Sequence, residues 1–142
     1  MMKYIISIIA ILGLFINSVF AGGHKKIKVG MITTVSGGGS GLGIDVRDGF
    51  LLAVKGDNHF EVIVKDDQRK PDIAVQIADK MIQSDKVDVL TGIIWSNLAM
   101  AVVPAAVKQG KFYLSPNAGP SKLAGKGLSL IHIWRCRRDS AC

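Results

Sequence analysis

The sequence predicts an α/β fold built on a parallel, doubly wound sheet, and two observations support this prediction. Four short apolar segments border glycine-rich or polar stretches, as buried parallel strands do. Between these segments, apolar residues recur at the spacing of amphipathic helices. No cysteine lies between residues 22 and 127, so a hydrophobic core alone must hold this region. Alternating strands and helices with right-handed crossovers place helices on both faces of one sheet.

The first predicted strand covers residues 27–34 (IKVGMITT), an apolar run that leads into a glycine-rich loop at 35–43 (VSGGGSGLG). The first helix follows this loop, because apolar side chains then recur at helical spacing while charged residues occupy the other faces. We expect this helix to turn four residues toward the sheet, namely Val46, Phe50, Leu51 and Val54.

The second predicted strand covers residues 60–67 (FEVIVKDD), in which polar and apolar residues alternate. Pro71 then stands where the first turn of a helix tolerates a missing N–H, and Asp72 complements the positive end of the helix dipole. The helix that follows is expected to bury a stripe made of Ile73, Ala74, Ile77, Ala78, Met81 and Ile82.

The third and fourth predicted strands cover residues 87–93 (VDVLTGI) and 112–116 (FYLSP). Between them lies an apolar helical stretch, SNLAMAVVPAAVKQG, in which Pro104 either opens the main helix or kinks it. Ligands of open parallel sheets bind beyond the carboxyl ends of the strands. We therefore expect a ligand site among four loops, at residues 36–43, 66–70, 92–97 and 115–121.

The amino terminus, residues 1–21, has the features of a cleavable signal peptide. Lys3 precedes an apolar run at 5–16, and Val19 and Ala21 occupy the small-residue positions of a cleavage site. A membrane anchor is the alternative, but the apolar run is shorter than the roughly 20 residues that cross a bilayer. We therefore expect an exported, periplasmic protein that begins at Gly22.

The charge of the chain argues against nucleic acid as a partner. The formal net charge is +7, but residues 22–127 hold 14 basic and 10 acidic residues, which leaves +4. This mild excess is spread along the chain, with one small cluster at Lys25, Lys26 and Lys28 and no interleaved aromatic residues. A nucleic-acid-binding domain normally concentrates its positive charge on one surface.

The glycine-rich loop does not match a phosphate-binding motif. It contains no G-x-G-x-x-G, and a P-loop would need lysine after Gly43, where Ile44 stands. The loop is therefore interpreted as a strand-to-helix turn whose backbone amides can contact a small ligand. We expect no cofactor.

Catalytic and metal-binding patterns are absent from the sequence. Asp66 and Asp67 are adjacent at a strand end, but adjacent strand residues point to opposite faces, so turn formation and helix capping are the expected roles. No histidine and carboxylate cluster has metal-ligand spacing. The nucleophile-elbow motif G-x-S-x-G does not surround any of the loop serines Ser36, Ser40, Ser96 and Ser115. The sequence therefore predicts a binding protein without catalytic residues and without a metal.

Trp95, Ser96 and Asn97 form the most informative polar group, at the end of the third predicted strand. Together they can supply an apolar wall, a hydroxyl and an amide to one small ligand. Alternatively, Trp95 packs under the neighbouring loop. The segment SPNAGPSKLAG presents a similar choice, because the amides freed by a tight turn at Gly119 and Pro120 either meet a ligand or stay solvated.

Three stretches in this order resemble the amino-terminal lobe of the periplasmic solute-binding proteins of branched-chain amino acid ABC importers. They are IKVGMITTVSGGGSGLGIDVRDGFLLAV, KDDQRKPDIAVQIADKMIQSDKVDVLTGIIWSNLAMAVVP and YLSPNAGPSKLAG. The resemblance covers about residues 27–127, so residues 22–127 are expected to be lobe I of a type I periplasmic binding protein fold. It implies two α/β lobes that close on a small carboxylate ligand and deliver it to an ABC permease in the inner membrane.

The resemblance also implies which residues contact the ligand. Ser96 occupies the position whose serine meets the ligand carboxylate, and Asn117, Ala118 and Gly119 match the loop that supplies backbone groups and a small hydroxyl residue. Gly119 departs from the pattern because it has no hydroxyl. The first loop keeps Ser36, whereas Leu42 replaces the usual aromatic residue. The D-D-Q, K-P-D and N-A-G-P-S pieces resemble the members associated with aromatic and related carboxylic acids.

The last fifteen residues, LSLIHIWRCRRDSAC at 128–142, differ in composition from the rest, since they contain both cysteines of the chain. LSLIHI back-translates to CTG TCT CTT ATA CAC ATC, which matches a transposase adapter used in DNA sequencing libraries. We therefore expect a truncated gene fragment whose tail is translated adapter. The alternative is a genuine hinge strand at Leu128, Leu130 and Ile131. Two other functions remain possible: a ligand-sensing receptor ectodomain and a Rossmann-type oxidoreductase.

Overall fold

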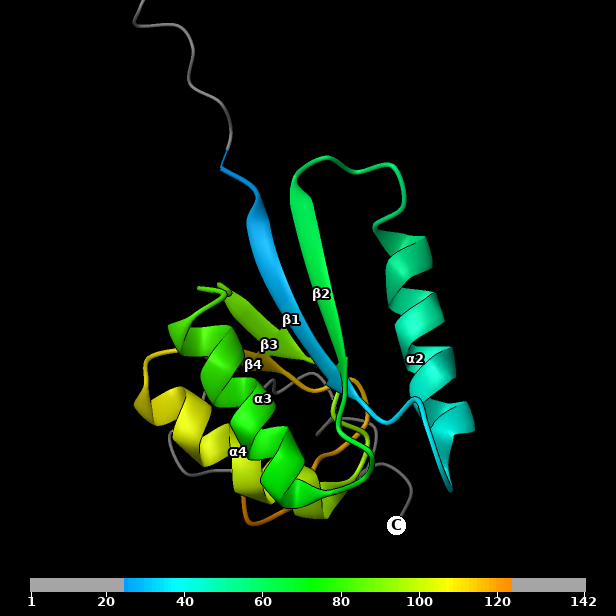
Figure 1. Ribbon diagram of the computed structural model, residues 1–142, viewed down its shortest axis with the longest axis vertical. Coiled ribbons are helices and arrows are strands. Elements are labelled where there is room, and N and C mark those ends of the chain that lie inside the picture. Colours follow the sequence, from blue (N-terminus) through cyan, green and yellow to red (C-terminus); the bar gives the residue numbers. More distant parts are fainter. Residues whose placement is uncertain (1–24, 124–142) are drawn as a thin grey trace, which may run out of the picture.

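The computed structural model describes residues 25–123, which form a four-stranded parallel sheet with three helices (Figure 1). The strands are β1 (Ile27–Thr33), β2 (Phe60–Asp66), β3 (Val89–Thr91) and β4 (Phe112–Leu114). The helices are α2 (Ser40–Ala53), α3 (Pro71–Gln83) and α4 (Ser96–Lys108). The predicted signal peptide (1–21) and tail (128–142) lie outside the described residues.

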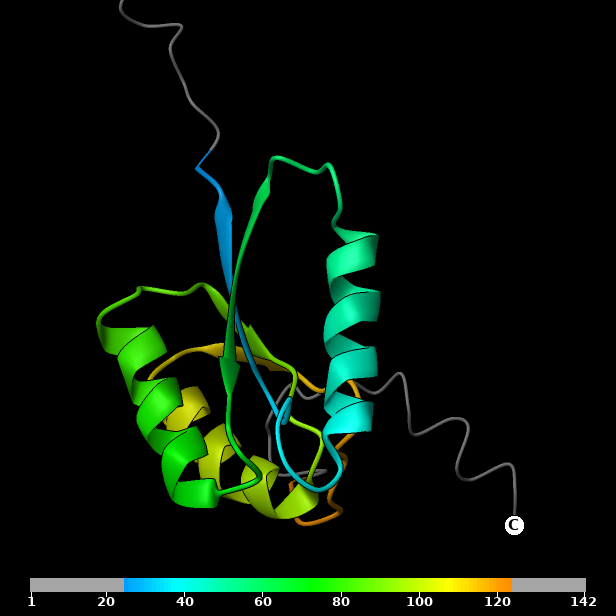
Figure 2. The ribbon, with the colours of Figure 1, turned by 45° about the vertical axis from the view of Figure 1, so that its right-hand side comes forward.

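The sheet has the strand order β2-β1-β3-β4, so the first strand lies inside it and the chain winds outward in both directions. α3 and α4 cover one face, and α2 lies against the opposite face (Figures 1 and 2). This arrangement confirms the predicted parallel, doubly wound fold. The hydrophobic core lies between the sheet and the α3/α4 pair, and its largest fully buried side chains include Tyr113, Ile32, Met81, Leu90, Ile93 and Leu98.

β3 and β4 are shorter than the sequence predicts. β1 pairs with β2 from Ile27 to Thr33, but β3 pairs with β1 and β4 over three residues only. β3 ends at Thr91 because Gly92, whose φ is 102°, turns the chain out of the strand there. A side chain at Gly92 would lie 2.8 Å from the carbonyl oxygen of Ile32, so the turn needs glycine there.

Helix α2 begins at Ser40, so it includes the last four residues of the predicted glycine loop. The expectation that residues 40–43 belong to the loop is therefore wrong. Gly43 is buried against the end of β1, which lets the first helical turn lie directly on that strand. Leu51 was expected to face the sheet but keeps 38% of its surface exposed. Val46, Phe50 and Val54 are half-buried, as predicted.

Helix α4 continues through Pro104, so the expectation that this proline opens the main helix is wrong. A proline in a helix removes one hydrogen bond to the carbonyl four residues earlier, here that of Met100. Both residues are exposed, so water can reach the carbonyl that loses its partner. The stripe predicted for α3 is largely correct, since Ala74, Ala78, Met81 and Ile82 are buried.

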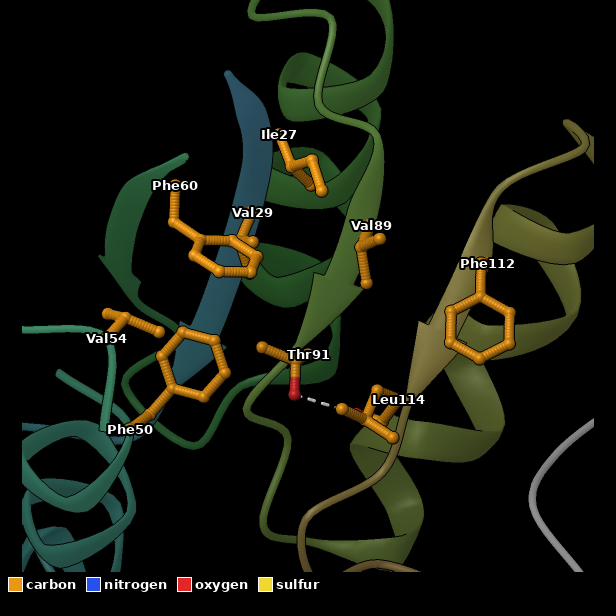
Figure 3. A pocket seen from close by; sticks show the side chains of 9 residues that line it. All are labelled: Ile27, Val29, Phe50, Val54, Phe60, Val89, Thr91, Phe112 and Leu114. Atoms are coloured by element: carbon orange, nitrogen blue, oxygen red, sulfur yellow. Dashed lines mark hydrogen bonds between the residues drawn. The ribbon is translucent and has the colours of Figure 1, made fainter. Parts of the chain in front are cut away.

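An apolar groove follows the face of the sheet that α2 covers only in part (Figure 3). Phe50 of α2 and Val54, which follows this helix, form one side of it. The floor comes from all four strands and includes Val29, Val89, Phe112 and Leu114. In residues 25–123, no helix is both long enough and apolar enough to cross a membrane.

Candidate functional site

The carboxyl ends of the four strands, at Thr33, Asp66, Thr91 and Leu114, meet at one edge of the sheet (Figure 1). The predicted ligand loops follow these ends. The apolar groove is a different place, on the face of the sheet, and its lining is apolar except for Thr91. The Thr91 hydroxyl donates to the Leu114 carbonyl over 2.8 Å (Figure 3), so the groove offers a carboxylate nothing that orients it.

The turn after β2 is built by the two adjacent aspartates. Asp66 Oδ1 accepts the backbone N–H of Gln68 over 2.9 Å, and Asp67 Oδ1 accepts that of Arg69 over 2.8 Å. These bonds hold Gln68 and Arg69 in the left-handed region, with φ of 51° and 60°. Turn formation is thus confirmed. Helix capping is wrong, because Lys70 is the N-cap of α3 and makes no side-chain cap.

Asp66 also ties the first loop to this turn. Its carboxylate accepts hydrogen bonds from the Ser36 hydroxyl and from the backbone N–H of Val35. Partial burial acts to raise the pKa of Asp66, but the bonds from Ser36, Gln68 and Val35 outweigh it and hold the pKa below its usual value. The carboxylate is therefore ionised at neutral pH. The Ser36 hydroxyl, a predicted ligand group, already has a partner within the protein.

Trp95 is held from three sides. Its Nε1–H donates to Thr34 Oγ1 over 3.0 Å, and that threonine in turn donates to the buried Asp67 Oδ1 over 2.6 Å. The ring edge lies against Gly39, where an added Cβ would come within 2.6 Å of Trp95 Cζ2. The guanidinium carbon of Arg69 lies 4.0 Å from the ring centroid. Packing under the neighbouring loop, one of the two predicted roles, is therefore what the indole does, and it stays half-buried.

Ser96 and Asn97 are the first two residues of α4, and both side chains are exposed. The first helical hydrogen bond at this end runs from the Ala99 N–H to the Trp95 carbonyl. Trp95 makes no side-chain cap, so the backbone N–H groups of Ser96 and Asn97 have no acceptor within the helix. The start of α4 thus presents two N–H donors, a hydroxyl and an amide at the carboxyl edge of the sheet.

The loop after β4 uses its polar groups within the protein. The Asn117 side chain donates to the Ile94 carbonyl over 3.1 Å, which ties this loop to the one that follows β3. The Ser115 hydroxyl donates to the Ala118 carbonyl. Ala118 is buried and Gly119 is exposed. Asn117 and Ala118 therefore position the loop, while Asn117 and Gly119 are the exposed members of the predicted trio.

Leu42 lies in the first turn of α2, and 53% of its surface is exposed. The sequence placed it in a flexible ligand loop, whereas the structure places it on a helix. Its apolar side chain is available at the start of α2, although the structure brings it into no described contact with Ser96 or Gly119.

The sequence did not reveal the contacts that three residues make at this edge, namely Thr34, Arg69 and Ser115. Thr34 was counted as the last residue of a buried strand, but its hydroxyl joins Asp67 to Trp95. Arg69 belongs to the K-D-D-Q-R-K segment, where it resembles any solvated cation. The aspartates Asp66 and Asp67 could have pointed to Arg69, because aspartates often form Asx turns, and such a turn fixes the direction of the side chains that follow it.

Among residues 25–123, no group of three or more histidine, cysteine, aspartate or glutamate residues is placed to hold a metal ion. Burial raises the pKa of the Tyr113 phenol, which is therefore protonated throughout the physiological range. The chemistry available at this edge is hydrogen bonding and charge recognition.

The family model and the solved structures that match this chain indicate the same family. The model of the periplasmic binding protein family matches residues 26–129. An ABC transporter substrate-binding protein from Sphaerobacter thermophilus is 28% identical, with a TM-score of 0.65 over 70% of this chain and 28% of that protein. No curated protein matches the chain.

Two solved structures from Rhodopseudomonas palustris are more similar in sequence. One is an ABC transporter solute-binding protein in complex with benzoate: it is 35% identical, with a TM-score of 0.62 over 66% of this chain and 28% of that one. The other, from strain BisB5, is in complex with 3,4-dihydroxybenzoic acid. It is 32% identical, with a TM-score of 0.64 over 68% of this chain and 28% of that one. The chain thus spans little more than a quarter of the length of these proteins.

Proposed function

The chain belongs to the periplasmic binding protein family, and from this premise we propose that it forms one lobe of the substrate-binding component of an ABC importer. The component would capture a small carboxylate ligand without changing it chemically. The observation that carries the proposal is the exposed start of α4, with Ser96 and Asn97 at the carboxyl edge of the sheet.

The start of a helix is suited to a carboxylate for two reasons. The backbone N–H groups of the first turn have no acceptor within the helix, and the helix dipole places partial positive charge there. In this chain, the Ser96 hydroxyl adds a third donor beside the N–H groups of Ser96 and Asn97. Hydrogen bonds to an ionised acceptor are the strong ones, so three such donors support recognition of a carboxylate.

Aromatic acids are the ligand class that we favour over branched-chain amino acids. Two relatives above 30% identity hold benzoate and 3,4-dihydroxybenzoic acid. The Thermotoga maritima leucine-binding protein is 22% identical, which supports the fold alone. The two carboxylates of the turn after β2 are also poorly placed to pair with an α-amino group, because Asp66 already bonds to Ser36, Val35 and Gln68, and Asp67 is fully buried.

Replacing Ser96 in the full-length protein tests the proposal. Ser96→Ala should weaken benzoate binding about tenfold to a hundredfold, because a hydrogen bond to a charged partner contributes roughly 1.5 to 3 kcal/mol. Isothermal titration against benzoate, 3,4-dihydroxybenzoate and leucine measures the change.

Ser84→Ala is the matched control, since Ser84 is also exposed but lies at the end of α3, away from the carboxyl edge. Equal affinity in Ser96→Ala and wild type would remove Ser96 from the site. Tight binding of sugars, with no binding of any carboxylate, would reject the ligand class and with it this function.

The proposal places the mature protein in the periplasm, where it delivers its ligand to an ABC permease in the inner membrane. Residues 1–21 would direct export, since Val19 and Ala21 form a small-residue cleavage site behind an apolar run. Expression in a bacterial host should yield a periplasmic chain whose intact mass corresponds to a start at Gly22. A periplasmic product that still begins at Met1 would contradict this.

A second lobe is required for tight binding, because small-molecule sites bury most of the ligand surface. The described residues form a single edge, open to solvent at Ser96, Asn97 and Gly119. We therefore propose that the remainder of the protein closes over this edge and supplies the other contacts.

A further inference from the structure

The side chain of Arg69 is held over the carboxyl edge by an unusual local geometry. Gln68 and Arg69 are two consecutive non-glycine residues with positive φ, a conformation that L residues adopt at a cost. The Asp66 and Asp67 carboxylates hold it by accepting the two backbone N–H groups. Strain of this kind persists where the surrounding structure fixes it, and such positions cluster at functional sites.

The guanidinium itself is fixed by two further contacts. It stacks on the Trp95 indole with its carbon 4.0 Å from the ring centroid, and Nη1 donates to the Gly38 carbonyl over 3.3 Å. The indole below it is in turn anchored to Thr34. The planar cation is therefore pre-organised before any ligand arrives, which reduces the entropy that binding would otherwise cost.

No ion pair in the part of the chain that the structure describes includes the Arg69 guanidinium. The ion pairs found there join Lys25 to Asp88, Lys28 to Glu61, Arg47 to Asp48 and His59 to Asp57. Its acceptor, the Gly38 carbonyl, is uncharged. The stack leaves other N–H donors of the exposed guanidinium able to meet an anion.

Arg69 also lies next to a second source of positive potential. The residue that it covers, Trp95, immediately precedes Ser96, where the positive end of the α4 dipole is exposed. The ionised Asp66 in the same turn bonds to Ser36, Val35 and Gln68 rather than to the guanidinium. The guanidinium and the start of α4 can therefore act together on an anion. We propose that Arg69 is a ligand-binding residue that selects carboxylates over their neutral analogues, with Trp95 as its support. This inference rests on the proposed function.

The experiment compares benzoate with benzamide, which has nearly the same shape and no charge. Arg69→Met keeps an unbranched apolar chain over Trp95 and removes the cation. In the full-length protein it should weaken benzoate binding about tenfold or more and leave benzamide binding unchanged. The benzoate affinity of Arg69→Lys should lie between those of the wild type and Arg69→Met, because lysine keeps the charge but lacks the planar guanidinium. Lys70→Met is the matched control, since Lys70 is the next residue, is also exposed and carries the same charge.

Each outcome is decisive. A selective loss of benzoate in Arg69→Met, with Lys70→Met close to wild type, supports the inference. An equal loss in both variants would show that only the general field of the protein acts, and would overturn it. Unchanged benzoate affinity in Arg69→Met would overturn this inference alone and leave the proposed function intact. A wild-type protein that binds no carboxylate would overturn both.

Salt dependence provides an independent readout. Attraction between exposed charges is screened within roughly 10 Å at 0.1 M salt. Benzoate binding to the wild-type protein should therefore weaken between about 0.02 M and about 0.5 M NaCl, and this slope should be shallower in Arg69→Met. Identical slopes in both proteins would count against a direct role of the guanidinium.

Discussion

Gly43→Ala is expected to destabilise the protein by more than about 3 kcal/mol, at the upper end of overpacking effects. Gly43 is buried in the first turns of α2, and a Cβ added there would lie 1.8 Å from the Thr34 carbonyl oxygen. That neighbour is backbone at the end of the central strand β1, so it cannot move aside as a flexible side chain would. The helix must shift away from the strand, and the Thr34 contact with Trp95 moves with it.

Gly49→Ala is the matched control in the same helix. Gly49 is exposed, and nothing lies within 4 Å of its added Cβ. Glycine inside a helix is less favourable than alanine by roughly 0.5 to 1 kcal/mol, so this variant should be slightly more stable than wild type. Urea unfolding of the full-length proteins, followed by circular dichroism, measures both. If Gly43→Ala unfolds at the wild-type midpoint, the close packing of α2 on β1 is incorrect.

Asp67→Ala is expected to cost about 2 to 4 kcal/mol of stability and to weaken ligand binding as well. Asp67 is fully buried, and its Oδ1 accepts both the Thr34 hydroxyl and the Arg69 N–H. Removing the carboxylate leaves these two donors without an acceptor, and each buried donor without a partner costs about 1 to 3 kcal/mol. The loss affects binding because Thr34 anchors Trp95, and the turn positions Arg69.

Asp67→Asn separates the hydrogen bonds from the charge. Both bonds end on the same oxygen, and asparagine keeps an acceptor oxygen at that position. We expect this variant to lose less stability than Asp67→Ala, because the Thr34 and Arg69 donors keep their acceptor. Some loss remains, since the amide NH2 replaces Asp67 Oδ2, which is buried without a partner. Chemical denaturation together with benzoate titration tests both variants. Similar losses in Asp67→Ala and Asp67→Asn would show that the negative charge, rather than the acceptor, is what the turn requires.

The strands and helices could be predicted because their signals are local. The runs at Ile27–Thr33 and Phe60–Asp66 are apolar or alternating, and Pro71 with Asp72 marks the start of α3. The carboxyl end of β3 and the start of α2 were predicted wrongly, since each depends on a glycine whose role is set by distant atoms. The chain turns at Gly92, close to the Ile32 carbonyl, and Gly43 packs on the Thr34 carbonyl.

The location of the candidate site could be predicted from the sequence, but the contacts within it could not. The rule that ligands bind at the carboxyl ends of parallel strands located the loops, and Ser96 lies there at the exposed start of α4. Residue types alone do not show that the polar groups of Asn117 and Ser36 bond within the protein. Arg69 was missed because its significance comes from a stack on a residue 26 positions away in the sequence.

The sequence by itself determined the alternation of strand and helix, the parallel sheet and the edge at which a ligand would bind, because hydrophobic period and turn residues are properties of neighbouring positions. Only the tertiary structure decided which polar groups remain available at that edge. Hydrogen bonds between Thr34, Asp67 and Trp95 join residues from three separate loops, and a buried donor takes whichever acceptor the fold brings within reach. The sheet is thus encoded by local pattern, and the site by long-range contact.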